Sequence, residues 1–142
     1  MIYTRLTDIN DKDIPQILSV YNIPSVSRYV SIDEDSYWKY VTETPNVFFY
    51  KVFDNGNLVA TVHFELNDSV MYMDIVVFPQ YQNRGIGTSI LKDIKNKSLS
   101  LDYSEISVSI DESNIASIKL FEKSGFKYVG REDELLDYIY HA

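Results

Sequence analysis

Hydrophobic and polar positions follow two different spacings along the chain, and each spacing predicts a different kind of element. Alternation over Ile2–Leu6 predicts a short opening strand. Residues 11–22 begin with acidic side chains and then place apolar residues three and four positions apart, which predicts a first helix. Ser31 or Asp33 can cap a second helix, which ends before Pro45 because the residue preceding a proline avoids helical backbone.

From residue 46 the spacing changes to two, which indicates strands. Asn46–Phe53 and Leu58–Leu66 are rich in β-formers, and the Asn55-Gly56 pair between them is typical of a tight hairpin turn. A second hairpin joins Leu58–Leu66 to Ser69–Val77, and we place its two-residue turn at Asn67-Asp68. The middle of the chain is therefore an antiparallel meander.

After this meander, helices and strands alternate again. The predicted elements are a helix with apolar residues at 86, 90, 91 and 94, a strand at Glu105–Ile110, a helix at Asn114–Ser124, and strands at Lys127–Glu132 and Leu135–Tyr140. Because helices separate strands at both ends of the meander, the predicted fold class is α/β or α+β with a mixed sheet.

Composition narrows the classes of function that this fold can serve. The chain has 142 residues with 45% hydrophobic content, so we expect a single domain spanning residues 1–142. Its net charge of −8 repels phosphate backbones and anionic lipid, and we expect neither nucleic acid nor a membrane as partner. The early Asp8 and the absence of a long apolar run predict a soluble, cytoplasmic protein without a signal peptide.

The absence of cysteine removes three further possibilities. A disulfide framework, a cysteine-based zinc site and a cysteine-bound acyl intermediate are all excluded, and we expect no metal. Only His63 and His141 remain as histidine bases.

The segment Val77–Thr88 is the most informative, because it ends a strand and opens a helix with two glycines. Helix N-termini expose unpaired N–H groups, and glycines let the backbone approach a bulky anion, so a diphosphate suits this turn. A nucleoside-triphosphate loop requires a lysine after Gly87, where the chain has Thr88. A dinucleotide loop requires a third glycine at the position of Ile90.

A third phosphate motif fits at every defining position. Gln82-x-x-Gly85-x-Gly87, preceded by Val77-x-Pro79, resembles the coenzyme-A loop of the GNAT family, the GCN5-related N-acetyltransferases. About thirty residues downstream, Asn114-x-Ala116-x-x-x-Leu120-Phe121-Glu122-Lys123-x-Gly125-Phe126 resembles the second signature of that family. The resemblance implies a mixed, mostly antiparallel sheet of about six to seven strands flanked by about four helices.

The resemblance also implies how acetyl-CoA binds as the acyl donor. The main-chain N–H groups of the glycine turn would hold the pyrophosphate; these belong to Gln82, Asn83, Arg84, Gly85, Ile86, Gly87 and Thr88. The strand at Ile75, Val76 and Val77 would pair with the pantetheine arm, with the amide near Ile75 facing the thioester oxygen, and Asn114 would bond the same arm.

Basic side chains near the glycine turn have two interpretations. Residues 82–97 carry four Lys or Arg and one Asp, the only part of the chain with a clear positive excess. Arg84, Lys92, Lys95 and Lys97 can supplement the anion site; for the three lysines the alternative is a solvated helix face.

One position departs from the family pattern. Many members carry a tyrosine seven residues after the signature asparagine, where it protonates the departing thiolate, but this chain has Phe121 at the cofactor. A thiol titrates near ~8.5, so its thiolate is already a tolerable leaving group. Tyr81, Tyr138, Tyr140 or water are alternative acids, and we nominate Tyr138.

Strand arithmetic identifies candidate bases. A turn at Asn67-Asp68 pairs Phe64 with Met71 and Val62 with Met73 on an apolar face. The opposite face then carries the candidate bases together, with His63 diagonal to Asp74. The candidates are Asp74, His63 and Glu65.

These three side chains can also form the polar edge of a hairpin packed under the first two helices. A bulge between Met71 and Val77 would change which of them share a face.

The function we expect is transfer of an acetyl group from acetyl-CoA to a primary amine of a small molecule or peptide, by direct attack in a ternary complex. Aromatic and acidic residues at 21–40 either line a pocket for the amine or belong to the core and the solvated surface. The alternatives are a non-catalytic acyl-CoA-binding module, motivated by Phe121, and acetylation of charged tRNA, which the acidic balance opposes. A homodimer is a possible assembly.

Overall fold

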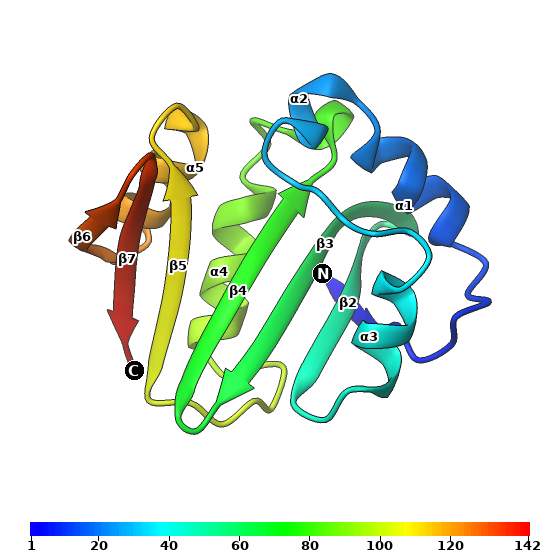
Figure 1. The fold of residues 1–142 in the computed structure, drawn as a ribbon, viewed down its shortest axis with the longest axis horizontal. Helices are drawn as coiled ribbons and strands as arrows, with labels where there is room; N and C mark the ends of the chain where they lie inside the picture. The colour runs from blue at the N-terminus through cyan, green and yellow to red at the C-terminus, as the bar shows by residue number, and fades with distance from the viewer.

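Seven strands form one sheet in the order β1-β2-β3-β4-β5-β7-β6 in the computed structural model, which covers residues 1–142 (Figure 1). Every neighbouring pair is antiparallel except β4 and β5, which run parallel. The predicted mixed, mostly antiparallel sheet is therefore confirmed. The strands are β1 (Ile2–Arg5), β2 (Val47–Asp54), β3 (Asn57–Asn67), β4 (Val70–Val77), β5 (Glu105–Asp111), β6 (Lys127–Glu132) and β7 (Leu135–His141).

Helices cover both faces of this sheet. They are α1 (Ile14–Tyr21), α2 (Pro24–Ser27), α3 (Tyr37–Glu43), α4 (Ile86–Lys95) and α5 (Ile115–Lys123), with a short 3-10 turn at Pro79–Tyr81. In Figure 1, α1 to α3 lie over the β2–β4 half on one face, and α4 and α5 lie behind the sheet on the other. The four-residue α2 was not predicted, because a single turn has no hydrophobic period to detect. No helix is both long and apolar enough to cross a membrane.

Two apolar clusters fill the spaces between the helices and the sheet. One packs α4, α5 and the back of β3 to β5, with Phe64, Ile90 and Ile106 fully buried. The other packs α1 to α3 against the front, around Ile17 and Phe49. Because both faces of the β2–β4 half are covered, these strands are largely apolar on both sides.

The first hairpin turns as the sequence predicts. β2 ends at Asp54 and β3 begins at Asn57, so Asn55 and Gly56 alone form the turn. Both have positive φ, 51° and 79°, the conformation that asparagine and glycine tolerate best.

The second hairpin corrects the predicted register. The turn lies at Asp68-Ser69, one residue later than predicted, because Asp68 takes the left-handed conformation at φ 55° and leaves Asn67 paired with Val70. Phe64 therefore pairs with Met73, not with Met71. A shift of two residues keeps every side chain on its predicted face, so the candidate bases still share one side. The pairing of β3 with β4 continues without a bulge.

Candidate functional site

The parallel strands β4 and β5 separate along their length and leave a gap in the sheet (Figure 1). They pair only from Val70 to Tyr72, against Glu105 to Ser107. On the other edge of β4, just after the strand ends, the N–H of Phe78 donates to the carbonyl of Val59 on β3 at 2.9 Å. Because main-chain groups alternate between the two edges of a strand, the even-numbered residues of β4 direct their N–H and C=O groups toward β3. The main-chain groups of Ile75 and Val77 therefore face the gap, where no strand pairs with them.

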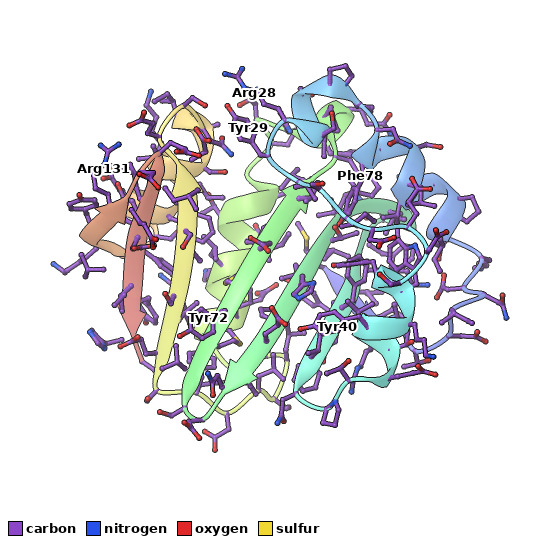
Figure 2. The ribbon with its side chains drawn as sticks, in the orientation of Figure 1. Arg28, Tyr29, Tyr40, Tyr72, Phe78 and Arg131 are labelled. Carbon is purple, nitrogen blue, oxygen red and sulfur yellow. The ribbon has the colours of Figure 1, made fainter.

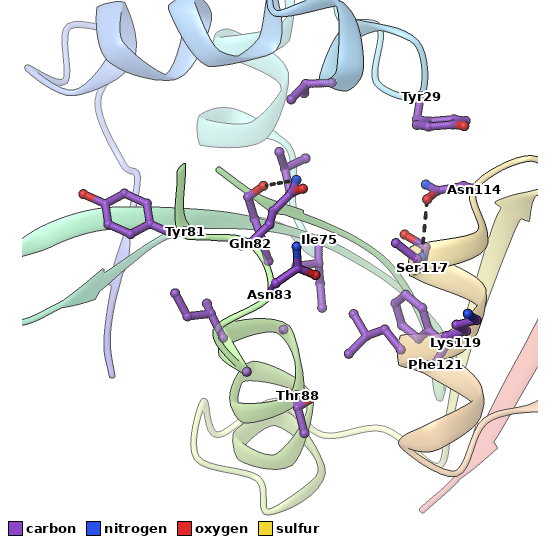
Figure 3. Close-up of a pocket in the computed structure, with 18 of the residues that line it drawn as sticks. Tyr29, Ile75, Tyr81, Gln82, Asn83, Thr88, Asn114, Ser117, Lys119 and Phe121 are labelled. Atoms are coloured by element: carbon purple, nitrogen blue, oxygen red, sulfur yellow. Dashed lines mark hydrogen bonds between the residues drawn. The ribbon is translucent and has the colours of Figure 1, made fainter. Parts of the chain in front are cut away.

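A cavity of about 460 Å³ occupies this gap and extends to the N-terminus of α4 and along α5 (Figure 3). Its lining includes eleven of the twelve residues predicted to contact coenzyme A. They are Ile75, Val76, Val77, Gln82, Asn83, Gly85, Ile86, Gly87, Thr88, Asn114 and Phe121. Two signatures far apart in the sequence thus line one cavity.

The glycine turn leaves a row of N–H groups available at one end of this cavity. Asn83 and Gly85 both have positive φ, 62° and 77°, and Gly85 is the N-cap of α4. The helical bonding begins with the N–H of Ser89, which donates to the carbonyl of Gly85 at 3.0 Å. The amides of Asn83 to Thr88 are therefore free to bind an anion, and the helix dipole favours negative charge there. The amide of Gln82, also predicted as a donor, is not free, because it already donates to the carbonyl of Pro79 at 3.3 Å. Gln82 steadies the turn by donating its side-chain N–H to the carbonyl of Val77 at 3.1 Å.

Gly87 allows two helices to approach closely at the cavity. A Cβ atom at this position would lie 2.9 Å from Cδ2 of Leu120 on α5. The first turn of α4 and the middle of α5 therefore approach each other at this residue, and both line the cavity.

The basic side chains at the cavity differ from those nominated from the sequence. Arg84, the twelfth predicted contact, does not line the cavity but lies over the ring of Tyr81, 5.7 Å from its centroid. The lining also lacks Lys92, Lys95 and Lys97. Lys95 donates to the carbonyl of Ser124 at 2.7 Å, and Lys97 donates to that of Tyr103 at 2.8 Å.

Two lysines of α5 line the cavity instead. Lys119 and Lys123 share its wall with Ala116 and Leu120. The spacing of three and four residues puts all four on one side of a helix. This periodicity was the signal that could have identified them from the sequence.

Asn114 and Phe121 also lie on the α5 side of the cavity. Asn114 caps α5, because its side-chain oxygen accepts from the N–H of Ser117 at 3.3 Å (Figure 3). Its side-chain NH₂ group keeps both donors for a ligand. Phe121 is buried edge-on against Phe126, with ring centroids 5.0 Å apart, and it presents no hydroxyl.

A second cavity, of about 220 Å³, lies on the front face of the sheet beneath the chain between α1 and α3. All three candidate bases line it: His63 and Glu65 from β3, and Asp74 from β4. His63 and Asp74 occupy directly opposed positions on the two strands, so the corrected register makes them cross-strand neighbours.

Two tyrosines of α3 complete a chain of polar contacts around His63. The hydroxyl of Tyr37 lies 2.6 Å from Nδ1 of His63. On the other side of the ring, Nε2 lies 3.5 Å from Oε2 of Glu65, and the other carboxylate oxygen, Oε1, accepts a hydrogen bond from Tyr40. Both ring nitrogens of His63 therefore have partners within the protein.

The surrounding protein raises the pKa of two ionisable groups that line this cavity. The protein atoms around the Asp74 carboxylate raise its pKa although the side chain remains accessible from the cavity; His63 opposes this shift and Glu65 adds to it. Burial also raises the pKa of Tyr37, so its hydroxyl keeps its proton at neutral pH. Tyr37 can therefore donate to Nδ1 of His63.

The two cavities share three lining residues, Tyr29, Val30 and Val76. Tyr29 follows α2 and extends across the cleft toward α5, where its hydroxyl lies 3.0 Å from Oγ of Ser113 (Figures 2 and 3). A molecule in the gap between β4 and β5 can therefore meet a molecule in the second cavity at this junction.

The remaining nominated residues lie elsewhere. Tyr138, the nominated acid, lines neither cavity; it is buried on β7 and donates to a carboxylate oxygen of Glu122 at 2.9 Å. Asp33, Glu34 and Asp35 are exposed and also line neither cavity. Of the aromatic residues at 21–40, Tyr21, Tyr29 and Tyr37 line the second cavity and Trp38 belongs to the core. No group of three or more His, Cys, Asp or Glu residues is arranged to hold a metal ion.

Comparison with known protein families gives a match that covers much more of the chain than the two motifs. The acetyltransferase (GNAT) family model matches residues 14–126, which include both signatures and both cavities. The chain belongs to the GNAT acetyltransferase family. No curated protein matches it.

Solved GNAT-fold structures superpose on nearly the whole chain at low sequence identity. Campylobacter jejuni N-acetyltransferase PseH in complex with acetyl coenzyme A has a TM-score of 0.80 and 13% identity, with 99% of this chain and 97% of that chain covered. A chimera of Vibrio cholerae spermidine N-acetyltransferase SpeG and hSSAT has a TM-score of 0.78 and 18% identity, covering 99% and 96%. Aminoglycoside acetyltransferase AAC(6')-Ib, solved with coenzyme A and kanamycin, has a TM-score of 0.79 and 16% identity, covering 99% and 95%. At these identities the likeness establishes the fold.

Proposed function

We propose that this GNAT protein transfers the acetyl group of acetyl-CoA to a primary amine by direct attack within a ternary complex. The observation that carries the proposal is the junction of the two cavities at Tyr29, Val30 and Val76. One cavity has the free amides and main-chain edge that suit a diphosphate and an amide-containing arm, and the other holds a carboxylate with a raised pKa. Each substrate therefore has its own compartment, and the reacting atoms meet between them.

The donor binds in the gap between β4 and β5. Its pyrophosphate accepts hydrogen bonds from the amides of the glycine turn, and its pantetheine arm pairs with the free edge of β4 at Ile75 and Val77. The N–H of Ile75 is then available to the acetyl carbonyl oxygen, where negative charge develops in the transition state. PseH and AAC(6')-Ib, solved with acetyl coenzyme A and coenzyme A, support this assignment by analogy.

Asp74 is the general base in this mechanism. Its carboxylate takes a proton from the bound ammonium, which frees the nitrogen lone pair to attack the acetyl carbon and form the new N–C bond; a second proton passes from the nitrogen to solvent. The C–S bond then breaks, and the electron pair leaves with sulfur as the coenzyme A thiolate. A raised pKa suits Asp74 to this task, because a base with a pKa closer to neutral accepts a proton more readily.

His63 is a positioning residue for this base. The Glu65 carboxylate near Nε2 can only accept a hydrogen bond, which favours the ring proton on Nε2; in that tautomer Nδ1 accepts from Tyr37. With both nitrogens engaged, His63 has no free lone pair for the proton of the substrate nitrogen. It instead fixes the surroundings of the cross-strand neighbour Asp74.

Protonation of the departing thiolate is left to solvent. Phe121 lines the donor cavity and has no proton to give. The thiol of the product has an ordinary pKa near ~8.5, so an unprotonated thiolate can leave at neutral pH.

Steady-state release of free coenzyme A with a panel of amines tests the proposal. We expect release that depends on both acetyl-CoA and an amine, with intersecting double-reciprocal lines, as direct transfer requires. The alternative favoured by Phe121 is a non-catalytic acyl-CoA-binding module. Tight binding of acetyl-CoA in calorimetry, without turnover on any amine, would establish that alternative.

A further inference from the structure

The second cavity carries an uncompensated negative charge. Its eleven lining residues include two carboxylates, Glu65 and Asp74, and neither a lysine nor an arginine. Its one imidazole, that of His63, is engaged by Tyr37 and Glu65. The half-buried pair of carboxylates at the start of α1 does have a cation: Asp11 and Asp13 both contact Lys51 at 2.8 Å. A cationic ligand would supply the charge that the cavity lacks.

The two carboxylates are positioned for two separate cations. Glu65 pairs with Tyr72 and Asp74 pairs with His63, so the two acids are diagonal neighbours on one face of adjacent antiparallel strands. Diagonal positions are about 7–8 Å apart, a distance spanned by an alkyl chain of about five carbons. Asp74 lies two residues from Val76 at the junction of the cavities, whereas Glu65 lies farther from the donor.

The rest of the lining suits the chain between two such cations. The rings of Tyr21, Tyr29 and Tyr37, with Val30 and Ile32, form apolar and aromatic walls. The hydroxyls of Tyr21 and Tyr37 already have partners, Thr61 Oγ1 and His63 Nδ1, each at 2.6 Å, so they make no demand on a ligand. Aromatic faces and carboxylates together favour ammonium groups linked by methylenes.

We propose that the acceptor is a small aliphatic diamine, with its reacting ammonium at Asp74 and its second ammonium bound by Glu65. This inference rests on the proposed acetyl transfer and names its substrate class. The cavity volume of about 220 Å³ is consistent with a ligand of this size, because pockets for larger, drug-sized ligands measure about 300–1,000 Å³. Glu65 is thus the residue that determines specificity for a second positive charge.

Cadaverine and pentylamine provide the matched probes, because they share one carbon chain and differ in the second ammonium. We expect kcat/KM for cadaverine to exceed that for pentylamine by about tenfold or more, the usual worth of a hydrogen bond between charged groups. Glu65→Gln should reduce this ratio about tenfold. Glu43→Gln is the matched control; it removes a negative charge from α3 outside both cavities, and the ratio should stay at the wild-type value.

A binding measurement separates this inference from the proposed function. Calorimetry with the protein saturated with coenzyme A should detect cadaverine binding that is stronger than pentylamine binding and weaker in Glu65→Gln. Such binding without any turnover would support the diamine site and refute the transfer. Turnover with equal kcat/KM for the two amines, or a ratio unaffected by Glu65→Gln, would refute the diamine site alone. So would a lysine-containing peptide that is acetylated faster than cadaverine.

Discussion

The two cavities are built from different parts of the polypeptide. The donor cavity depends on main-chain groups: the amides of the glycine turn, the free edge of β4 and the close approach of Gly87 to Leu120. The second cavity depends on side chains from α1, α3, β3, β4 and the segment after α2. Main-chain sites tolerate exchange of many side chains, whereas a side-chain site changes its ligand with one substitution. Donor recognition can therefore stay constant in a fold while acceptor recognition varies.

This difference predicts that changes in the two cavities have separable effects. A substitution at the glycine turn should weaken donor binding whatever the acceptor. A substitution in the second cavity should alter turnover or acceptor preference and leave donor affinity unchanged.

Gly87→Glu should have the largest effect. Its side chain collides with Leu120 and adds a carboxylate where the pyrophosphate binds, so we expect acetyl-CoA affinity to fall by about a hundredfold or more. Calorimetric titration measures this loss. Gly130→Glu is the control, because a Cβ atom there meets nothing within 4 Å and the residue lies on β6 outside both cavities. Unchanged affinity in Gly87→Glu would refute the assignment of the loop.

Asp74→Asn should lower kcat by about a hundredfold or more, because an amide cannot accept the amine proton. The acetyl-CoA dissociation constant should not change. Asp68→Asn, in the exposed turn of the same hairpin, is the control.

The pH dependence of the rate tests whether the pKa of Asp74 is raised. Because Asp74 has a raised pKa, it becomes an active base only as the pH rises through a value above that of an ordinary aspartate. The low-pH limb of kcat/KM should therefore lie above the usual aspartate range in the wild type and be absent in Asp74→Asn. The free energy of unfolding should change in the opposite direction: it should fall as the pH rises through the raised pKa of Asp74, because the ionised carboxylate destabilises the folded state. Asp74→Asn should therefore not lower Tm at neutral pH. A low-pH limb that persists in the variant would assign the base to another group.

Tyr37→Phe should have an intermediate effect. It removes the hydroxyl partner of Nδ1 and holds the His63 ring less firmly beside Asp74, whose pKa His63 influences, so we expect kcat to fall about three- to tenfold with a changed pH profile. Acetyl-CoA affinity should not change. Tyr128→Phe, on an exposed residue of β6, is the control. A purely structural role would lower Tm without altering the pH profile.

Phe121→Tyr should have the smallest effect. A hydroxyl at this position faces the donor cavity and can protonate the thiolate, but thiolate departure is already feasible near neutral pH, so the gain in kcat should be below about threefold. A much larger gain would show that thiolate protonation limits the wild-type rate.

The elements of the fold could be predicted because their signals are local. Asn55-Gly56 determines the first turn, and the apolar spacing of α4 and the cap at Asn114 identify their helices. The second turn could not be placed, because Asn67-Asp68 and Asp68-Ser69 are both acceptable to local turn chemistry. That ambiguity changed the partner of His63 but not its face, since a shift of two residues preserves the alternation.

The donor site could also be predicted because its signals are local, whereas the acceptor site could be predicted only in part. Both donor signatures are short, and each is continuous in the sequence. The contribution of Tyr37 depends on how α3 packs over β3, and the absence of Arg84 and Lys95 from the cavity depends on contacts with Tyr81 and Ser124. Such tertiary contacts leave no regular spacing of residues in the sequence from which they could be predicted. The single domain, the homodimer and the cellular location stay predictions.

The short pairing of β4 with β5 gives the sheet a third open edge, inside the molecule. The outer edges, at β1 and β6, can meet other chains, and unpaired strand edges are the usual starting points of aggregation. The edge at Ile75 and Val77 lies inside the donor cavity, where a β-strand could add to it only by entering between α4, α5 and the segment around Tyr29. A slender, flexible chain carrying its own amides can do so. The fold thus keeps unpaired main-chain N–H and C=O groups available to a small molecule and limits the access of other proteins to them.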